Sequence, residues 1–167
     1  SAGAEAAAVV EHARSRVAAL IEAKPTEVFF TGSATESNNW LLATARELDL
    51  ITAVLCTEHS SLLSPLQLDS NGVLLPVDRN GHIQVSALES LLQKGTIGLV
   101  SIALINNETG TIQDLAQIAK LCREHGALIH TDAAQALGHT DVSVKKLGVD
   151  YMTLSSHKAG GPKGVAA

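Results

Sequence analysis

The sequence predicts an α/β fold: a mainly parallel central sheet covered by helices on both faces. Short apolar runs alternate with stretches of helical periodicity along the chain. The run 98–105 is apolar throughout, which is typical of a strand buried on both faces. Hydrophobic residues make up 46% of the chain and aromatic residues only 2%, so a core of aliphatic side chains can pack helices closely on a sheet. We expect the 167 residues to form one domain without a repeat or a linker.

The first third of the chain predicts a helix, a strand and a second helix. Apolar residues recur at helical spacing over residues 4–23, and Pro25 ends that pattern. The short apolar run 27–30 predicts a strand. Small and polar residues at 31–39 predict a turn that leads into a helix over residues 40–48.

The rest of the chain continues the alternation of strands and helices. Asp114 is expected to cap a helix that runs to Glu124 and is closed by Gly126. The other expected strands and helices are a strand over 51–56, a helix over 62–68, a strand over 73–77, a helix over 85–93, and strands over 98–105, 127–131 and 151–154, with a short connection at 142–147.

Composition excludes several classes of function. The net charge of −5 offers no basic surface for nucleic acid. No apolar run is long enough for a transmembrane helix, and residues 1–5 lack the start of a signal peptide. Cys56 and Cys122 lie within apolar patterns without metal-ligand spacing, so we expect two buried, reduced thiols and no metal site. A cytoplasmic protein is the expectation.

Polar clusters follow the predicted strands at their carboxyl ends. Because these ends of parallel strands lie at one edge of a sheet, where ligands bind, the clusters are expected to share one crevice. The candidate residues are Ser33, Ala34 and Thr35 after the first strand, then His59, Asn107, Asp132 with Gln135, and finally Ser155, His157 and Lys158.

Lys158 is the candidate nucleophile. Gly160, Gly161 and Pro162 prevent a helix from continuing through this stretch, so Lys158 is expected on a tight turn. A lysine amine that is desolvated there loses its charge and becomes nucleophilic, as a Schiff-base lysine requires. Taken alone, a lysine in a glycine-rich loop is more often a surface residue.

Each remaining cluster allows a binding role and a structural one. The 33–35 turn could bind a phosphate at a helix N-terminus or simply cap that helix. Asp132 could hold a protonated pyridine nitrogen or cap a helix, and His59 could stack on a ring, move a proton or be structural. Asn107 and Gln135 could bind a phenolic oxygen or tie loops together. Together with Lys158, these groups provide what pyridoxal 5′-phosphate requires.

Several short motifs resemble one family over essentially the whole chain. They are Thr-Gly-Ser-Ala-Thr-Glu-Ser-Asn-Asn at 31–39, Thr-Glu-His at 57–59, Asn-Asn-Glu-Thr-Gly at 106–110, His-Thr-Asp-Ala-Ala-Gln at 130–135, Ser-Ser-His-Lys at 155–158 and Gly-Pro-Lys-Gly at 161–164. The chain resembles cysteine desulfurases of the NifS/IscS type, within the class V aminotransferases of pyridoxal-phosphate fold type I. The resemblance implies that residues 1–167 are a single cofactor-binding large domain.

The resemblance also implies roles for the candidate residues. Lys158 would form the internal aldimine and share proton transfer with His59, which would stack on the cofactor ring. Asp132 would pair with the pyridine nitrogen. The other contacts implied are Asn107 and Gln135 to the ring oxygen, and Ala34, Thr35, Ser155 and His157 to the phosphate. The implied reaction takes sulfur from L-cysteine to give alanine and an enzyme persulfide. A homodimer, a sulfur-acceptor protein and iron–sulfur cluster biogenesis are implied as well.

The chain departs from the family pattern in two ways. Its turn reads Gly-Ser-Ala-Thr where the family has Ser-Gly-Ala-Thr, and Thr109 replaces an isoleucine. Family members are about twice as long, so an N-terminal arm and the small domain, with its substrate arginine and loop cysteine, are expected to lie outside this chain. The alternatives are another class V activity, such as selenocysteine lyase or aminotransferase, and a truncated non-catalytic domain. A dinucleotide-binding domain is disfavoured, since no Gly-x-Gly-x-x-Gly follows the first strand.

Overall fold

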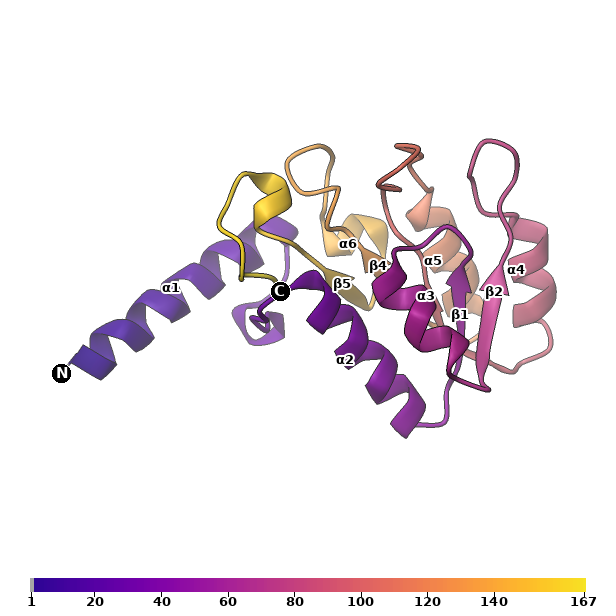
Figure 1. The fold of residues 1–167 in the computed structure, drawn as a ribbon, viewed down its shortest axis with the longest axis horizontal. Helices are drawn as coiled ribbons and strands as arrows, with labels where there is room; N and C mark the ends of the chain where they lie inside the picture. The colour runs from indigo at the N-terminus through magenta and orange to yellow at the C-terminus, as the bar shows by residue number, and fades with distance from the viewer. Residues whose placement is uncertain (1) are drawn as a thin grey trace.

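A computed structural model describes residues 2–167 and shows a five-stranded sheet with helices on both faces (Figure 1). The strands are β1 (Ile51–Leu55), β2 (Gly72–Leu75), β3 (Ile97–Ser101), β4 (Leu128–Asp132) and β5 (Tyr151–Thr153). Their order across the sheet is β2-β1-β3-β4-β5, and every neighbouring pair is parallel. This confirms the predicted fold class.

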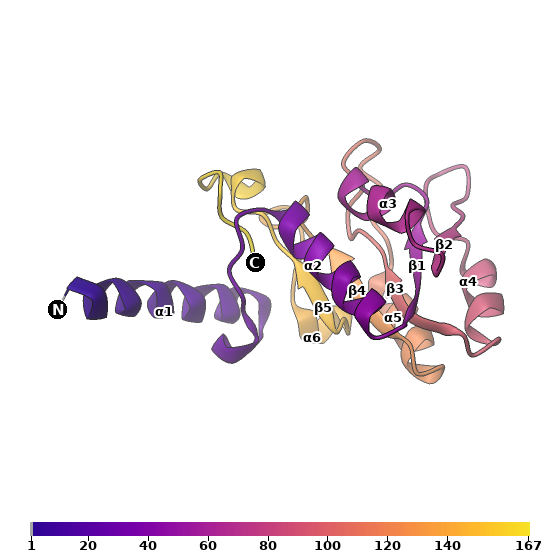
Figure 2. The same cartoon turned by 60° about the horizontal axis from the view of Figure 1, so that its bottom comes forward.

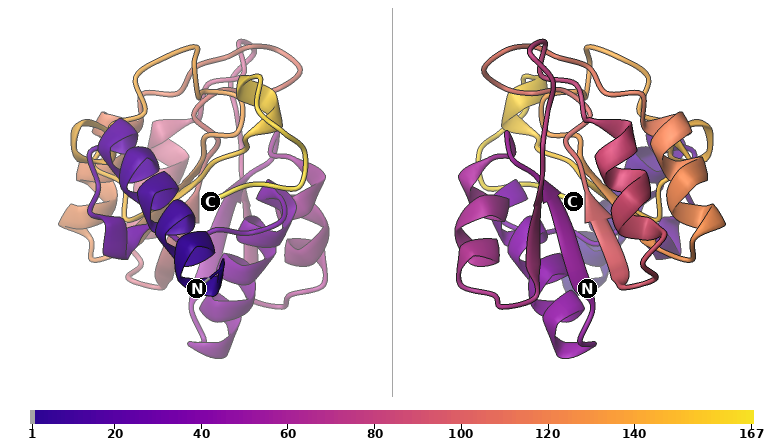
Figure 3. Two further views of the ribbon diagram at one scale, coloured as in Figure 1. Left: turned by 90° about the vertical axis from the view of Figure 1, so that its left-hand side faces the viewer. Right: turned by 90° about the vertical axis from the view of Figure 1, so that its right-hand side faces the viewer.

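The helices form a layer on each side of the sheet, with α2 and α3 on one side and α4 and α5 on the other (Figure 3). The helical elements are α1 (Ala2–Ile21), η1 (Pro25–Glu27), α2 (Ala34–Glu47), α3 (Ser60–Gln67), α4 (Val85–Leu92), α5 (Leu115–Glu124), α6 (Val144–Leu147) and η2 (His157–Ala159). Asp114 caps α5 as predicted, since its side chain accepts the Gln117 N–H at 3.2 Å. Within residues 2–167 no helix combines the length and hydrophobicity needed to cross a bilayer.

The two faces of β1 bury side chains in two separate cores. Ala53 and Leu55 point into the larger core beneath α4 and α5, whereas Val54 packs against Leu62 and Leu66 of α3. This is the alternation of a pleated strand. Both faces are apolar because helices cover both, so the strand reads as a continuous apolar run.

Helix α1 projects from the body of the molecule (Figure 1 and Figure 2). The helical periodicity is confirmed, but only Ala18 and Ile21 of this helix are buried. Val9 and Leu20, which belong to the predicted apolar face, are 69% and 58% exposed. Within the described residues, most of that face is therefore uncovered.

The strand predicted over 27–30 is wrong. The η1 turn ends at Glu27, and residues 28–30 have no regular structure. The segment is followed only by an isolated antiparallel bridge between Thr31 and Ala166, with both N-to-O distances at 2.9 Å. The segment lies outside the sheet, beside a groove of about 920 Å³ that borders β5. None of the five described strands pairs with residues 27–30, so they do not extend the sheet.

The second helix begins at Ala34 and not near residue 40. Its N-cap is Ser33, whose hydroxyl accepts the Glu36 N–H at 3.1 Å, while the Glu36 carboxylate accepts the Gly32 N–H at 2.8 Å. These two bonds satisfy backbone donors at the helix start, as in a capping box. The small polar residues at 34–39 are therefore the first turns of α2.

The two cysteines differ in exposure. Cys122 of α5 is buried as predicted, and this burial raises the pKa of its thiol to about 12. The prediction that Cys56 is buried is wrong: β1 ends at Leu55, and Cys56 is exposed on the turn that follows. Both thiols are free. The remaining predicted strands and helices overlap the observed ones.

Candidate active site

Polar side chains at the carboxyl ends of four strands surround a cavity of about 300 Å³. Residues at the N-terminus of α2 complete its wall. The structure brings together all nine residues to which the resemblance assigns a role: Ala34, Thr35, His59, Asn107, Asp132, Gln135, Ser155, His157 and Lys158. The larger groove beside β5 contains none of them, so we place the candidate site at the smaller cavity. The chemical roles of the nine residues stay predictions.

Asp132 provides a buried carboxylate at the end of β4. One oxygen, Oδ2, accepts the Asn38 side-chain N–H at 2.8 Å, and Oδ1 accepts the Ala134 backbone N–H at 2.9 Å. Among the described residues, no lysine, arginine or histidine forms an ion pair with it. The next helix begins only at Val144, so the alternative role as a helix cap is not found. The carboxylate is oriented by neutral donors and is free to pair with a cation in the cavity.

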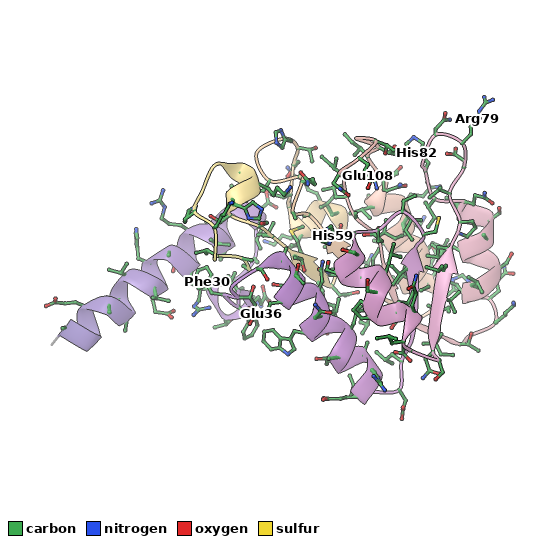
Figure 4. The ribbon with its side chains drawn as sticks, viewed as in Figure 1. Phe30, Glu36, His59, Arg79, His82 and Glu108 are labelled. Carbon is green, nitrogen blue, oxygen red and sulfur yellow. The ribbon has the colours of Figure 1, made fainter. Side chains whose placement is uncertain are left out.

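His59 caps the start of α3, on the edge of the sheet where the site lies (Figure 4). Its Nδ1 accepts the Ser61 backbone N–H at 3.1 Å and lies 2.8 Å from the Ser61 hydroxyl oxygen. Because Nδ1 acts as an acceptor, the proton of the neutral ring is on Nε2. The structural role and a role in the cavity are therefore compatible, since they use different ring nitrogens.

The N-terminus of α2 offers a site for an anion. Ser33, Ala34 and Thr35 line the cavity at the start of this 14-residue helix, where backbone N–H groups and the helix dipole favour negative charge. Ser33 is extended, with φ −165° and ψ 158°, so the reversed Gly-Ser order needs no left-handed backbone. On the same cavity, the Ser155 hydroxyl lies 3.1 Å from Nδ1 of His157.

Lys158 lies on the short η2 turn that follows β5. Gly160 ends this turn with a φ of 81°, and a Cβ at Gly161 would overlap the Ser156 side chain and lie 3.0 Å from the Ser156 carbonyl oxygen. The two glycines therefore fix the turn that carries the lysine. The expectation of a desolvated lysine is wrong for the described chain, because the turn stands at the rim of the cavity and Lys158 is exposed.

Glu58 is a site residue that sequence reasoning missed. Its side chain lines the cavity and is only 6% exposed. Oε1 accepts the Ala103 N–H at 2.6 Å, while Oε2 is buried without a hydrogen-bond partner. Burial raises the pKa of this carboxyl to about 8; the Ala103 hydrogen bond opposes that rise and the negative charge of Asp132 adds to it. Its place between Thr57 and His59, after a buried strand, is the signal that could have revealed it.

His130 has a structural role behind the site. It is buried in β4, with Nδ1 2.8 Å from the Ser101 hydroxyl and Nε2 3.1 Å from the Thr153 hydroxyl. Burial lowers its pKa to about 4, against the opposite effect of Asp132. The neutral ring thus joins three adjacent strands and supports the strand ends that carry the site.

Sequence comparison identifies the family to which a protein with this fold and cavity belongs. The sequence model for the aminotransferase class-V family matches residues 1–167, and the chain belongs to this family. This confirms the resemblance noted from the motifs.

Two similar proteins carry the name cysteine desulfurase. The mitosomal cysteine desulfurase of Encephalitozoon cuniculi is 40% identical over 99% of this chain and 40% of the relative. The cysteine desulfurase IscS of Ehrlichia chaffeensis is 41% identical over 99% of this chain and 42% of the relative. The chain therefore spans about two fifths of the length of these relatives.

Solved structures show the same fold. A NifS-like protein superposes with a TM-score of 0.93 at 37% identity, covering 99% of this chain and 48% of that structure. A structure described as SspA in complex with cysteine superposes with a TM-score of 0.88 at 31% identity, covering 98% of this chain and 49% of that one.

Proposed function

We propose that this chain is the pyridoxal-phosphate-binding domain of a cysteine desulfurase, and that the whole enzyme converts L-cysteine to alanine and an enzyme persulfide. The observation that carries the proposal is the convergence of Lys158, Asp132 and the N-terminus of α2 on one cavity of about 300 Å³. The relatives named cysteine desulfurase support the reaction and the substrate.

The residues of the cavity fit this cofactor. Both Asp132 oxygens accept hydrogen bonds from neutral groups, which do not cancel the charge of the carboxylate. That negative charge is therefore available to keep a ring nitrogen protonated. The free N–H groups of α2 suit a phosphate. Bound pyridoxal phosphate would supply an aldehyde and an electron sink for the amino-acid substrate. The residues proposed to hold it are Lys158 at the aldehyde, Asp132 at the ring nitrogen, Asn107 and Gln135 at the ring oxygen, and Ala34, Thr35, Ser155 and His157 at the phosphate.

Two side chains of the site can carry protons. The Lys158 amine is on the rim of the cavity, and the neutral His59 ring holds its proton on Nε2. Nδ1 of His59 is held by Ser61, so Nε2 is the nitrogen free to donate or accept within the cavity. We assign proton transfer to Lys158 Nζ and His59 Nε2, and no catalytic cysteine to this chain, because neither Cys56 nor Cys122 lines the cavity.

Three wider proposals follow from family membership and from the resemblance to NifS/IscS proteins. We propose a homodimer, transfer of sulfur to an acceptor protein for iron–sulfur cluster assembly, and a cytoplasmic location. Two free thiols are compatible with a reducing compartment. We also propose that residues 1–167 form one cofactor-binding domain, since a single sheet positions the whole cavity.

The cofactor assignment is tested by incubating the purified chain with pyridoxal phosphate and recording its visible absorbance. We expect a visible absorbance band from the protein-bound cofactor, and borohydride reduction should remove this band and attach the cofactor covalently to Lys158. The Lys158→Ala variant should lose the band, whereas Lys163→Ala, a matched change in the same exposed loop, should keep it. A wild-type chain without any Lys158-dependent band would refute the proposal.

The reaction is tested with the whole enzyme that contains these residues, because no catalytic cysteine is assigned to this chain, by measuring alanine formed from L-cysteine and from L-selenocysteine. Alanine from L-cysteine supports the desulfurase. Product from L-selenocysteine alone would favour a lyase of the same family, and cofactor binding without product from either would favour a non-catalytic domain.

A further inference from the structure

A buried amide connects two parts of the candidate site. Asn38, in the second turn of α2, has no solvent exposure. Its side-chain N–H₂ group donates to Asp132 Oδ2 at 2.8 Å and to the Ser61 hydroxyl at 2.9 Å. The orientation of the amide is set by chemistry, since an ionised carboxylate only accepts hydrogen bonds. In this orientation the Asn38 Oδ1 atom is buried without a partner.

The chain of contacts continues from Asn38 to His59. The Ser61 hydroxyl accepts from Asn38, so its own proton can be directed to Nδ1 of His59, 2.8 Å away. The Ser61 backbone N–H donates to the same nitrogen at 3.1 Å. Four side chains are thus linked without a gap: Asp132 of β4, Asn38 of α2, Ser61 of α3, and His59, which caps α3.

We propose that Asn38 and Ser61 are positioning residues that hold the Asp132 carboxylate and the His59 ring in one fixed arrangement around the cofactor cavity. The inference rests on the proposed function, because Asp132 and His59 matter to catalysis only if that cavity binds the cofactor. The unpartnered Oδ1 supports it: an arrangement selected for packing alone would not keep a buried amide with an unpaired acceptor.

The hydrogen-bonded path from Asp132 to His59 can fix the positions of these two groups, but it cannot conduct a proton between them. The amide nitrogen of Asn38 donates in both directions and has no lone pair available to accept a proton. A proton therefore cannot pass between Asp132 and His59 along this path. Asp132 keeps its negative charge for the cofactor, while His59 exchanges protons independently through Nε2.

The experiment compares Asn38→Ala, Ser61→Ala and the double variant with Asn39→Ala. Asn39 is the matched control, because it is the neighbouring asparagine on the same helix, is exposed, and bonds only the Thr35 carbonyl within α2. We measure the dissociation constant of pyridoxal phosphate and the pH midpoint of the bound absorbance. In metal sites, substituting a residue that orients a binding group typically lowers affinity by about 10- to 100-fold, and we expect the same order of magnitude here.

We expect Asn38→Ala to raise the dissociation constant by at least about tenfold and to move the pH midpoint, with a smaller effect of Ser61→Ala. The double variant should lose less binding free energy for pyridoxal phosphate than the two single variants lose in sum, because both residues belong to one hydrogen-bonded path. Asn39→Ala should bind like the wild type. Binding within about twofold of wild type by folded Asn38→Ala and Ser61→Ala would overturn the proposal. If Asn38→Ala does not fold, Ser61→Ala decides the question, since it removes only one hydroxyl.

A readout without cofactor separates this proposal from the function itself. Nitrogen-15 NMR of the 17.4-kDa chain reports which ring nitrogen of His59 carries the proton. We expect Nε2 in the wild type and a weaker preference in Ser61→Ala. A proton on Nδ1 in the wild type would contradict the proposed arrangement, even if pyridoxal phosphate binds. Conversely, failure to bind the cofactor with the Nε2–H form intact would refute the proposed function and leave the measured arrangement in place.

Discussion

Replacing Glu58 by glutamine should change how the stability of the fold depends on pH. The pKa of this buried carboxyl is about 8 in the fold, against an ordinary value of 4.5. Between these two pH values the folded chain holds a proton that the unfolded chain has released, so the free energy of unfolding falls as pH rises. The slope is about 1.4 kcal/mol per pH unit, and the total loss by pH 8 is roughly 4–5 kcal/mol.

His130 acts in the opposite direction over part of this range. Its pKa falls from 6.5 to about 4 on burial, so the unfolded chain binds the extra proton and stability rises with pH between these values. The contributions of His130 and Glu58 oppose each other below pH 6.5. From there to pH 8 the Glu58 effect acts alone, and the wild-type chain should lose about 2 kcal/mol.

Urea unfolding from pH 5 to pH 9 measures the effect. Other titrating groups are common to both proteins and cancel in the difference between Glu58→Gln and wild type. That difference should grow in favour of the variant up to about pH 8 and then level off. Glu89→Gln, at an exposed helix position, is the control and should give a constant difference. Parallel stability curves for Glu58→Gln and wild type would show that Glu58 is ionised in the fold and would refute the reasoning.

Two further substitutions test the support of the site. Ser33→Ala removes the N-cap of α2, so urea unfolding should show a free energy of unfolding lower by about 1 kcal/mol. The variant should also bind phosphate and pyridoxal phosphate more weakly. Stability and binding equal to those of the wild type would contradict this prediction. His130→Ala leaves a cavity and unpaired hydroxyls on Ser101 and Thr153, so we expect a loss of about 3 kcal/mol or more, measured at pH 7; a loss under about 1 kcal/mol would show that the buried network adds little.

The sequence was sufficient for the fold because the central strands β1 and β3 are buried on both faces. Apolar runs such as 51–55 and 97–101 can be recognised locally, and their alternation with helices dictates a parallel sheet. The strand expected at 27–30 failed for a non-local reason, since a strand needs a partner beside it. The start of α2 was misjudged because Ser33 and Glu36 were read as turn residues, although their spacing is that of a capping box.

The nine candidate residues could be assigned to one cavity from the sequence because each follows a strand or begins a helix, where its position follows from the topology. Exposure and hydrogen bonding depend on packing and could not be predicted in this way. Lys158 is exposed because its turn stands at the rim. Asn38 and Glu58 were identified as candidate site residues only from the structure. Asn38 hydrogen-bonds the Asp132 carboxylate, and Glu58 accepts the Ala103 N–H while its second oxygen is buried without a partner.

The parallel sheet also determines when the site can exist during folding. Each parallel pairing joins segments separated along the chain by a crossover, so these contacts form more slowly than local ones. The cavity takes residues from position 33 to position 158, and neighbours in space such as Asn38 and Asp132 are 94 residues apart in sequence. No early part of the chain can build this pocket. Cofactor capture should therefore be among the last events of folding, and the appearance of bound absorbance during refolding should follow the formation of helices.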